Sequence, residues 1–186
     1  MKTGSHLPDR LDISLRRAFY VAMQRLTLAA TLGLCLVLSG CDKFTPLSDD
    51  VQNLTFQTLT GDKLHLSKVT GPVLVNFWAT DCAICIREMP ELAELYEDYR
   101  TAGFELIAVA MPYDPPNKVL EMAEQQDWPF PVALDISGQV LSTFASVKGT
   151  PTSYLLNKDG QLVKRYVGAI PVTELRSQLD SLFGLS

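Results

Sequence analysis

The sequence predicts an α/β domain in which a mixed central sheet is flanked by helices and extended on its N-terminal side by a β-hairpin. Two nearly continuous apolar segments, 73–79 and 104–111, have the composition of strands buried on both faces. The segment between them, 82–100, repeats apolar residues at helical spacing. Two later segments, 152–156 and 161–167, flank an Asn-Lys-Asp-Gly turn and predict a second hairpin. A β-α-β half followed by a β-β-α half gives an α/β sandwich.

Local patterns predict the remaining elements. Alternating residues in 54–59 and 64–66 surround a glycine turn and predict the N-terminal hairpin. The helix over 82–100 should turn five apolar residues toward the core, namely Ile86, Met89, Leu92, Tyr96 and Tyr99. A helix, a short strand and a short helix are expected over 117–126, 131–134 and 139–145. An amphipathic helix over 172–183 should end at Gly184.

Composition narrows the function classes. The chain has 186 residues, 47% apolar and 20% charged, which is typical of one globular domain with an additional segment. It carries 16 Lys and Arg against 21 Asp and Glu, for a formal charge of -5. Because no excess of basic residues is present to hold a phosphate backbone, we expect no nucleic-acid partner. Four cysteines are too few for a disulfide scaffold, so each is considered in its own setting.

The first forty residues are expected to be a signal peptide. The segment 26–38 is uncharged and apolar, follows Arg25, and is shorter than the ~20 residues that a transmembrane helix requires. It ends in Leu38-Ser39-Gly40-Cys41, which resembles the lipobox of bacterial lipoproteins, where the chain is cut before the cysteine. Cys41 is therefore the expected lipidation site. An ordinary secreted protein with an unmodified Cys41 is the alternative.

Two further residues refine this targeting hypothesis. Met23 already begins a signal peptide of the usual length, so it is the expected true start of translation. Asp42 is similar to the residue that retains Gram-negative lipoproteins in the inner membrane. We therefore expect a signal peptide over 1–40, a lipidated cysteine and tether over 41–50, and a folded domain over 51–186. The protein should be anchored in the inner membrane and face the periplasm.

The pair Cys82 and Cys85 carries the predicted chemistry. Both residues lie where the buried strand meets the start of a helix, where unpaired N–H groups and the helix dipole lower the pKa of a thiol. Cys82 is the expected nucleophile, and Cys85, on the same helix face, the expected resolving thiol. Half of a zinc site is one alternative, although His65 is the only histidine after the signal peptide. A purely structural disulfide is the other.

Two segments resemble one family. Residues 73–90 (VLVNFWATDCAICIREMP) are similar to the active-site segment of the TlpA/ResA-like thiol-disulfide oxidoreductases, which are thioredoxin-fold proteins related to the AhpC/TSA and Redoxin proteins. Residues 149–152 (GTPT) match the second signature of the same family, and the similarity extends over 51–184. The resemblance implies a thioredoxin-like fold. It also implies a redox-active Cys82–Cys85 disulfide with no other cofactor and no metal.

The resemblance also assigns roles to single residues. Pro151 matches a proline that is cis in this fold and leaves the backbone of Thr150 to pair with substrate, whereas an ordinary turn would have a trans bond. Glu88 matches an acidic residue that takes the proton from Cys85, and the alternative is a solvated helix glutamate. Trp78 resembles a tryptophan that shields the site and contacts substrate, although a core aromatic has the same pattern.

Three positions distinguish the chain from its relatives in the wider fold. Asn76 stands where thioredoxin itself has an aspartate, so Glu88 is expected to take over the acid–base role. Asp81 and Ile84 stand where family members commonly have Trp and Pro. The negative charge of Asp81 should disfavour a thiolate at Cys82, which opposes the helix dipole.

The leading hypothesis is therefore a membrane-tethered thiol-disulfide oxidoreductase that reduces disulfides in exported proteins. The resemblance implies a membrane thiol donor of the DsbD or CcdA type and includes apocytochrome c among the candidate substrates. A thiol peroxidase is one alternative, because residues 135–138 resemble peroxiredoxin sequences, although no proline precedes Cys82 at the required spacing. A copper-delivery module is the other and would require His65 close to the cysteines.

Overall fold

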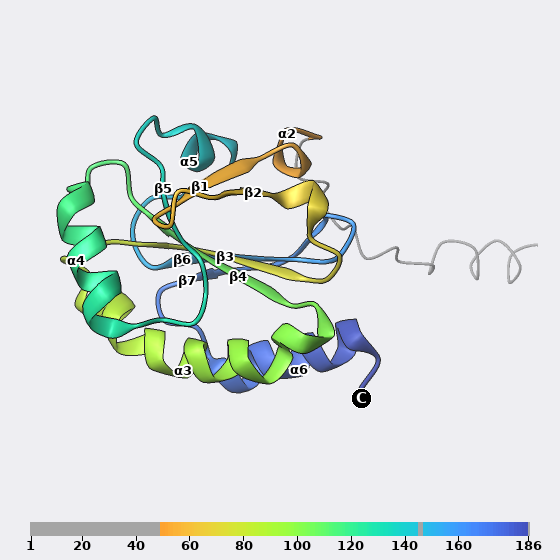
Figure 1. Ribbon diagram of the computed structural model, residues 1–186. Coiled ribbons are helices and arrows are strands. Elements are labelled where there is room, and N and C mark those ends of the chain that lie inside the picture. Colours follow the sequence, from red (N-terminus) through yellow and green to blue (C-terminus); the bar gives the residue numbers. More distant parts are fainter. Residues whose placement is uncertain (1–48, 145–146, 186) are drawn as a thin grey trace, which may run out of the picture. The chain divides into compact units, whose positions relative to one another are not determined.

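Seven strands form one mixed sheet in the order β2-β1-β5-β4-β3-β6-β7, in a computed structural model that describes residues 49–144 and 147–185 (Figure 1). Strand β3 pairs in parallel with β4, and β4 with β5, whereas the other neighbours are antiparallel. The strands are β1 (Thr55–Thr58), β2 (Lys63–His65), β3 (Val73–Trp78), β4 (Glu105–Ala110), β5 (Val132–Leu134), β6 (Thr152–Leu156) and β7 (Leu162–Val167). The predicted mixed sheet with an N-terminal hairpin is confirmed.

Helices cover both faces of this sheet. Figure 1 shows α3 and α6 side by side on one face and α2 and α5 on the other. The helices are α2 (Asp49–Gln52), α3 (Ala83–Tyr99), α4 (Pro116–Gln126), α5 (Gln139–Thr143) and α6 (Val172–Phe183), with 3-10 turns over Leu66–Lys68 and Arg100–Ala102. The expected α/β sandwich is thereby confirmed. None of the helices in this part of the chain is long and apolar enough to cross a membrane.

Strand β3 divides the core because all six of its side chains are buried. Leu74 and Trp78 point to the face covered by α3 and α6, and Phe77 points to the opposite face. Alternation along a strand sends successive side chains to opposite faces, so a strand buried on both faces is apolar throughout. Phe77 packs edge-on against Phe144, with ring centroids 5.4 Å apart. The polar exception on β3 is Asn76, which lies on the α3 face.

The structure differs from the sequence prediction at element ends. Helix α3 starts one residue after Cys82, and α5 ends at Thr143, two residues short of its predicted end. Ile86, predicted to be in the core, is only half buried, whereas Cys85 and Leu95 are fully buried. The other four predicted core residues of α3 are buried, and the buried stripe is wider than predicted because it also includes a polar side chain, described below. Helix α2 was not predicted.

The predicted signal peptide and Cys41 lie outside the described residues. So do residues 42–48 of the predicted tether. Asp49 and Asp50, the last residues of that segment, belong to α2, whose Val51 is fully buried in the core. The described fold thus begins slightly before residue 51.

Gly71 provides a stability prediction. A Cβ atom at Gly71 would lie 2.1 Å from the backbone oxygen of Gly103, so the two segments approach each other too closely for any side chain. We expect Gly71→Ala to lower the free energy of unfolding by about 1–3 kcal/mol, as overpacking of a core does. Gly149→Ala is the control, because no atom lies within 4 Å of the added methyl. Urea unfolding measures both, and equal stabilities would contradict the prediction.

Candidate active site

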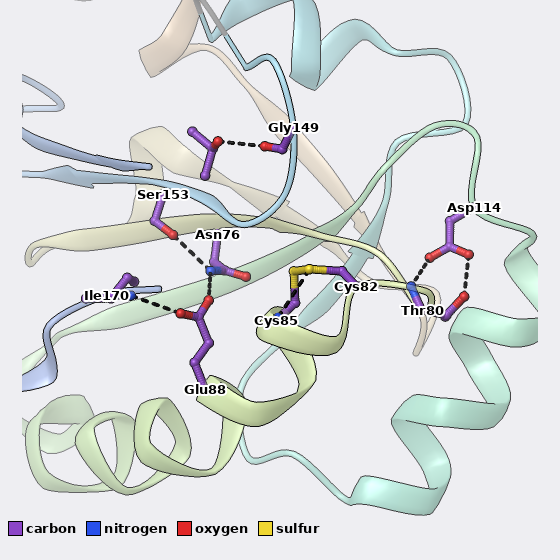
Figure 2. Close-up of a disulfide and its surroundings, with 10 residues drawn as sticks. Asn76, Thr80, Cys82, Cys85, Glu88, Asp114, Gly149, Ser153 and Ile170 are labelled. Carbon is purple, nitrogen blue, oxygen red and sulfur yellow. Dashed lines mark hydrogen bonds between the residues drawn. A yellow bond between two sulfur atoms is a disulfide. The ribbon is translucent and has the colours of Figure 1, made fainter. Parts of the chain in front are cut away.

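A disulfide joins Cys82 and Cys85 at the start of α3, with a Cα–Cα distance of 5.3 Å (Figure 2). Cys82 is the N-cap of the helix, and its Sγ accepts a hydrogen bond from the Cys85 N–H at 3.2 Å. Cys82 is half buried, whereas Cys85 has no exposed surface. An incoming thiol or disulfide therefore reaches the sulfur of Cys82 and not that of Cys85. This asymmetry fits the predicted division of roles between nucleophile and resolving thiol.

The loop before Cys82 is anchored by Asp114, a residue that the sequence prediction missed. The Thr80 backbone N–H and hydroxyl both donate to the Asp114 carboxylate, at 2.6 and 2.7 Å. Asp114 is almost fully buried and follows β4, the parallel neighbour of β3. Because the carboxyl ends of parallel strands meet at one edge of a sheet, the order of β3 and β4 brings these residues together. The sequence around Asp114 does not show that β3 and β4 are neighbours, so it gave no sign of this contact.

Glu88 lies one turn beyond Cys85 and is 7% exposed. Its Oε1 accepts a hydrogen bond from Asn76 Nδ2 at 3.2 Å, and its Oε2 accepts one from the Ile170 N–H at 3.0 Å (Figure 2). Asn76 Nδ2 also donates to Ser153 Oγ at 2.9 Å. Glu88 is thus not a solvated helix residue, in contrast to the exposed Glu91 and Glu94 on the same helix.

Burial raises the pKa of Glu88 above its usual value of 4.5. The hydrogen bonds from Ile170 and Asn76 favour the carboxylate and lower the pKa, but they do not outweigh the loss of solvent. The negative charge of Glu91 raises it further. A carboxyl group with a raised pKa, placed three residues from Cys85 on one helix face, is suited to take up a proton from that thiol.

The Thr150–Pro151 bond is cis, as the sequence predicted. Pro151 immediately precedes β6, in which Thr152 pairs with Phe77 near the carboxyl end of β3. Pro151 therefore lies at the sheet edge from which the loop to Cys82 leaves. The Pro151 carbonyl accepts a hydrogen bond from the Gly168 N–H at 2.9 Å, and the Thr152 hydroxyl donates to the Gly149 carbonyl at 2.7 Å (Figure 2). Pairing of substrate with Thr150 stays a prediction.

Trp78 requires a correction. It was predicted to contact substrate, but it has no exposed surface. Its indole packs edge-on against Trp128, with ring centroids 5.1 Å apart, and it belongs to the same buried cluster as Cys85. The position of Trp78 on a strand buried on both faces explains this, because every side chain of β3 is covered. Trp78 thus packs in the core next to the cysteine pair and does not contact substrate.

Two other sequence candidates lie away from the cysteines or have structural roles. His65 is on β2, separated from β3 by three strands, or about 19 Å at the usual strand spacing. Its ring Nδ1 shares a hydrogen bond with Thr55 Oγ1 at 2.9 Å.

The Asp135 carboxylate accepts hydrogen bonds from the N–H groups of Val140 and Leu141 at 3.1 and 2.7 Å, so it caps α5. Within the described ranges, no three His, Cys, Asp or Glu side chains cluster to hold a metal ion.

Comparison with known proteins identifies the family. The AhpC/TSA family model matches residues 47–165. The chain belongs to the AhpC/TSA family. Within it, the thiol-disulfide oxidoreductase ResA of Bacillus cereus is 34% identical over 137 residues, which cover 73% of this chain and 78% of that protein. A disulfide-bonded cysteine pair at a helix start and ResA relatives at this identity make the chain a thiol-disulfide oxidoreductase.

Solved structures agree with the predicted fold. A candidate thioredoxin from Neisseria meningitidis has a TM-score of 0.66 and 30% identity, covering 72% of this chain and 89% of that one. The pneumococcal exposed lipoprotein thioredoxin of Streptococcus pneumoniae has a TM-score of 0.62 and 25% identity, covering 69% and 98%. The predicted thioredoxin-like fold is confirmed.

The raised pKa of Glu88 makes protein stability depend on pH. The folded protein binds the Glu88 proton more tightly than the unfolded chain does, so this contribution to stability is complete below the ordinary pKa of 4.5 that applies to the unfolded chain. It is lost as the pH rises through the higher folded-state value. Glu88→Gln stays uncharged at every pH and should lack this loss. We therefore expect the unfolding free energy of the wild type to fall, relative to that of Glu88→Gln, as the pH rises above the unfolded-state value.

Chemical denaturation of both oxidised proteins at a series of pH values measures the difference. A difference that does not change with pH would contradict a raised pKa at Glu88. Glu94→Gln is a matched control on the exposed side of α3 and should follow the wild type at every pH.

Proposed function

We propose that this thiol-disulfide oxidoreductase is a membrane-tethered reductase of disulfides in exported proteins. The observation that carries the proposal is the environment of Cys82, whose sulfur accepts a hydrogen bond at the start of α3 and which has acidic residues close to it in the sequence. Asp81 directly precedes it and is exposed, and Glu88 lies buried on the next turn of the helix after Cys85. These charges oppose the stabilisation of a thiolate by the helix dipole.

This environment favours a low reduction potential. Strongly oxidising members of the thioredoxin fold owe their high potential to a reduced form that is stabilised. Negative charge beside Cys82 destabilises the thiolate and so favours the disulfide over the dithiol. A pair that prefers to be oxidised gives its electrons to substrates, which is the behaviour of a reductase.

The reaction uses the asymmetry of the two sulfurs. The Cys82 thiolate attacks a substrate disulfide, forming a mixed disulfide and releasing one substrate thiolate. Cys85 then passes its proton to Glu88 and attacks Cys82 Sγ. The substrate leaves as a second thiolate, which takes a proton from solvent, and the Cys82–Cys85 disulfide is formed. A second dithiol must then supply two electrons and two protons to restore the reduced pair.

Sequence features support the tether. The apolar run over 26–38 and the lipobox-like residues 38–41 support a signal peptide ending at residue 40 and a lipid on Cys41. The similar Streptococcus pneumoniae protein is an exposed lipoprotein. With Asp42 as a retention signal, the domain would face the periplasm from the inner membrane.

The partners follow from this placement. The protein substrates would be exported chains with cysteine pairs, among them apocytochrome c, and an extended substrate segment would pair with the backbone of Thr150. A membrane thiol donor of the DsbD or CcdA type would restore the reduced Cys82–Cys85 pair. Both assignments come from the resemblance of residues 73–90 and 149–152 to TlpA/ResA-like proteins.

The reduction potential tests the proposed direction of electron flow. We expect a value below about -220 mV, closer to that of thioredoxin at about -270 mV than to that of DsbA at about -120 mV. The purified protein is equilibrated with defined thiol buffers and followed by the fluorescence of Trp78 and Trp128, the two tryptophans of the chain. Asp81→Asn should raise the potential, because it removes a charge that disfavours the thiolate. A wild-type value near -120 mV would identify a disulfide donor and reject the reductase.

Membrane fractionation tests the tether. Cys41→Ser should abolish lipid attachment and move the protein out of the detergent-soluble membrane fraction, or leave its signal peptide uncleaved. Cys82→Ser is the matched control, because it removes a cysteine of the folded domain and should keep the protein in the membrane. Mass spectrometry of the wild-type N-terminus would show a lipid-modified Cys41, and an unmodified cysteine there would exclude the lipoprotein assignment.

A further inference from the structure

We infer that the side-chain oxygen of Asn76 accepts a hydrogen bond from the Cys85 thiol in the reduced enzyme, so that one buried carboxamide connects Cys85 to Glu88. The inference concerns the dithiol chemistry itself. It does not depend on the direction of electron flow or on the membrane tether.

The first observation is an unused acceptor. Asn76 has no exposed surface, and its Oδ1 is buried without a hydrogen-bond partner among the described residues. A buried polar atom left unpaired destabilises a protein. Such an atom in the centre of a site calls for a partner that another state of the enzyme supplies.

The second observation is that the orientation of the carboxamide is determined by its neighbours. The Asn76 NH2 group donates to Glu88 Oε1 at 3.2 Å and to Ser153 Oγ at 2.9 Å. An ionised carboxylate can only accept hydrogen bonds, so a reversed amide would place two acceptors against each other. With both N–H groups engaged, Oδ1 must point to the remaining side of the site.

The third observation is what lies on that side. Figure 2 shows the Asn76 oxygen turned away from Glu88 and Ser153 and directed toward the Cys85 side of the disulfide. Cys85 is fully buried in the same core cluster as Leu74 and Trp78, the neighbours of Asn76 along β3. In the disulfide, the sulfur of Cys85 carries no hydrogen and offers Asn76 no donor.

Reduction of the disulfide gives Cys85 a thiol hydrogen that it can donate to Asn76. Two electrons and two protons from a donor dithiol break the Cys82–Cys85 bond, and one proton is left on each sulfur at a pH below the thiol pKa. The proton on Cys85 is buried and needs an acceptor, which Asn76 Oδ1 provides. The hydrogen bond therefore exists only in the reduced state, and it holds the thiol proton beside the carboxylate that receives it during resolution.

A bond present only in the reduced state shifts the redox equilibrium toward the dithiol. Asn76→Leu keeps the shape of the side chain but removes the acceptor, so we expect the equilibrium constant for reduction to fall about tenfold, equivalent to about 30 mV toward more negative potential. Leu74→Val, on the same strand and face, should not change the potential, because it affects both redox states alike.

Infrared spectroscopy detects the hydrogen bond directly. In the full-length Cys82→Ser protein, the S–H stretching band of Cys85 is isolated by subtracting the spectrum of the Cys82→Ser/Cys85→Ser protein. We expect it at the lowered frequency of a hydrogen-bonded thiol and, on adding Asn76→Leu, at that of a free one. This measurement needs only the Cys82→Ser background if Asn76→Leu fails to fold.

Two results would overturn the inference. One is an S–H band at the free-thiol frequency in the Cys82→Ser protein. The other is a potential that Asn76→Leu leaves unchanged, which indicates a purely structural role for Asn76. Both measurements compare variants with the wild type, so they are independent of whether the absolute potential is that of a reductase.

Discussion

A buried carboxylate at Glu88 is the constraint around which the rest of the site is arranged. Removing a carboxyl group from water is unfavourable unless donors replace the solvent. Here the donors come from the centre of the sheet, through Asn76 on β3, and from the segment before α6, through the Ile170 N–H. Three separate parts of the chain must therefore come together before this group can be buried. These donors do not fully replace the lost solvent, so burial raises the pKa of Glu88. A raised pKa suits Glu88 to accept the proton of the Cys85 thiol.

The sheet topology determines what meets at the cysteines. Because β3 and β4 are parallel, the segments after them share one edge, where Asp114 holds the loop before Cys82 through Thr80. Because β6 runs antiparallel to β3, its start lies at the same edge, and Pro151 enters there. The helix that begins at this edge presents Cys82 to the surface and buries Cys85. The chemical inequality of the two sulfurs thus follows from the strand order.

Residue patterns predicted most elements but not their exact limits or all of their exposed faces. The apolar run that became β3 was recognisable because a strand buried on both faces leaves no polar alternation. Burial on both faces also explains why the prediction that Trp78 contacts substrate was wrong, since a fully covered strand presents no side chain to solvent. The prediction for Ile86 was wrong because apolar spacing alone does not show that the buried stripe of α3 passes through Cys85 and Glu88. A buried polar residue with distant partners has no signature in local hydropathy.

By itself, the sequence determined the order of all elements after α2 and the cysteine pair at a helix start, because each depends on residues close together in the chain. The cis bond before Pro151 was implied by the family resemblance of residues 149–152. The tertiary structure alone decided that Glu88 is buried, that Asp114 anchors the loop to Cys82, and that Asn76 contacts Glu88 and Ser153. Those contacts join residues separated by 12 to 82 positions. The physical reason is that hydrogen bonds between distant segments depend on strand order and register, which no local pattern encodes.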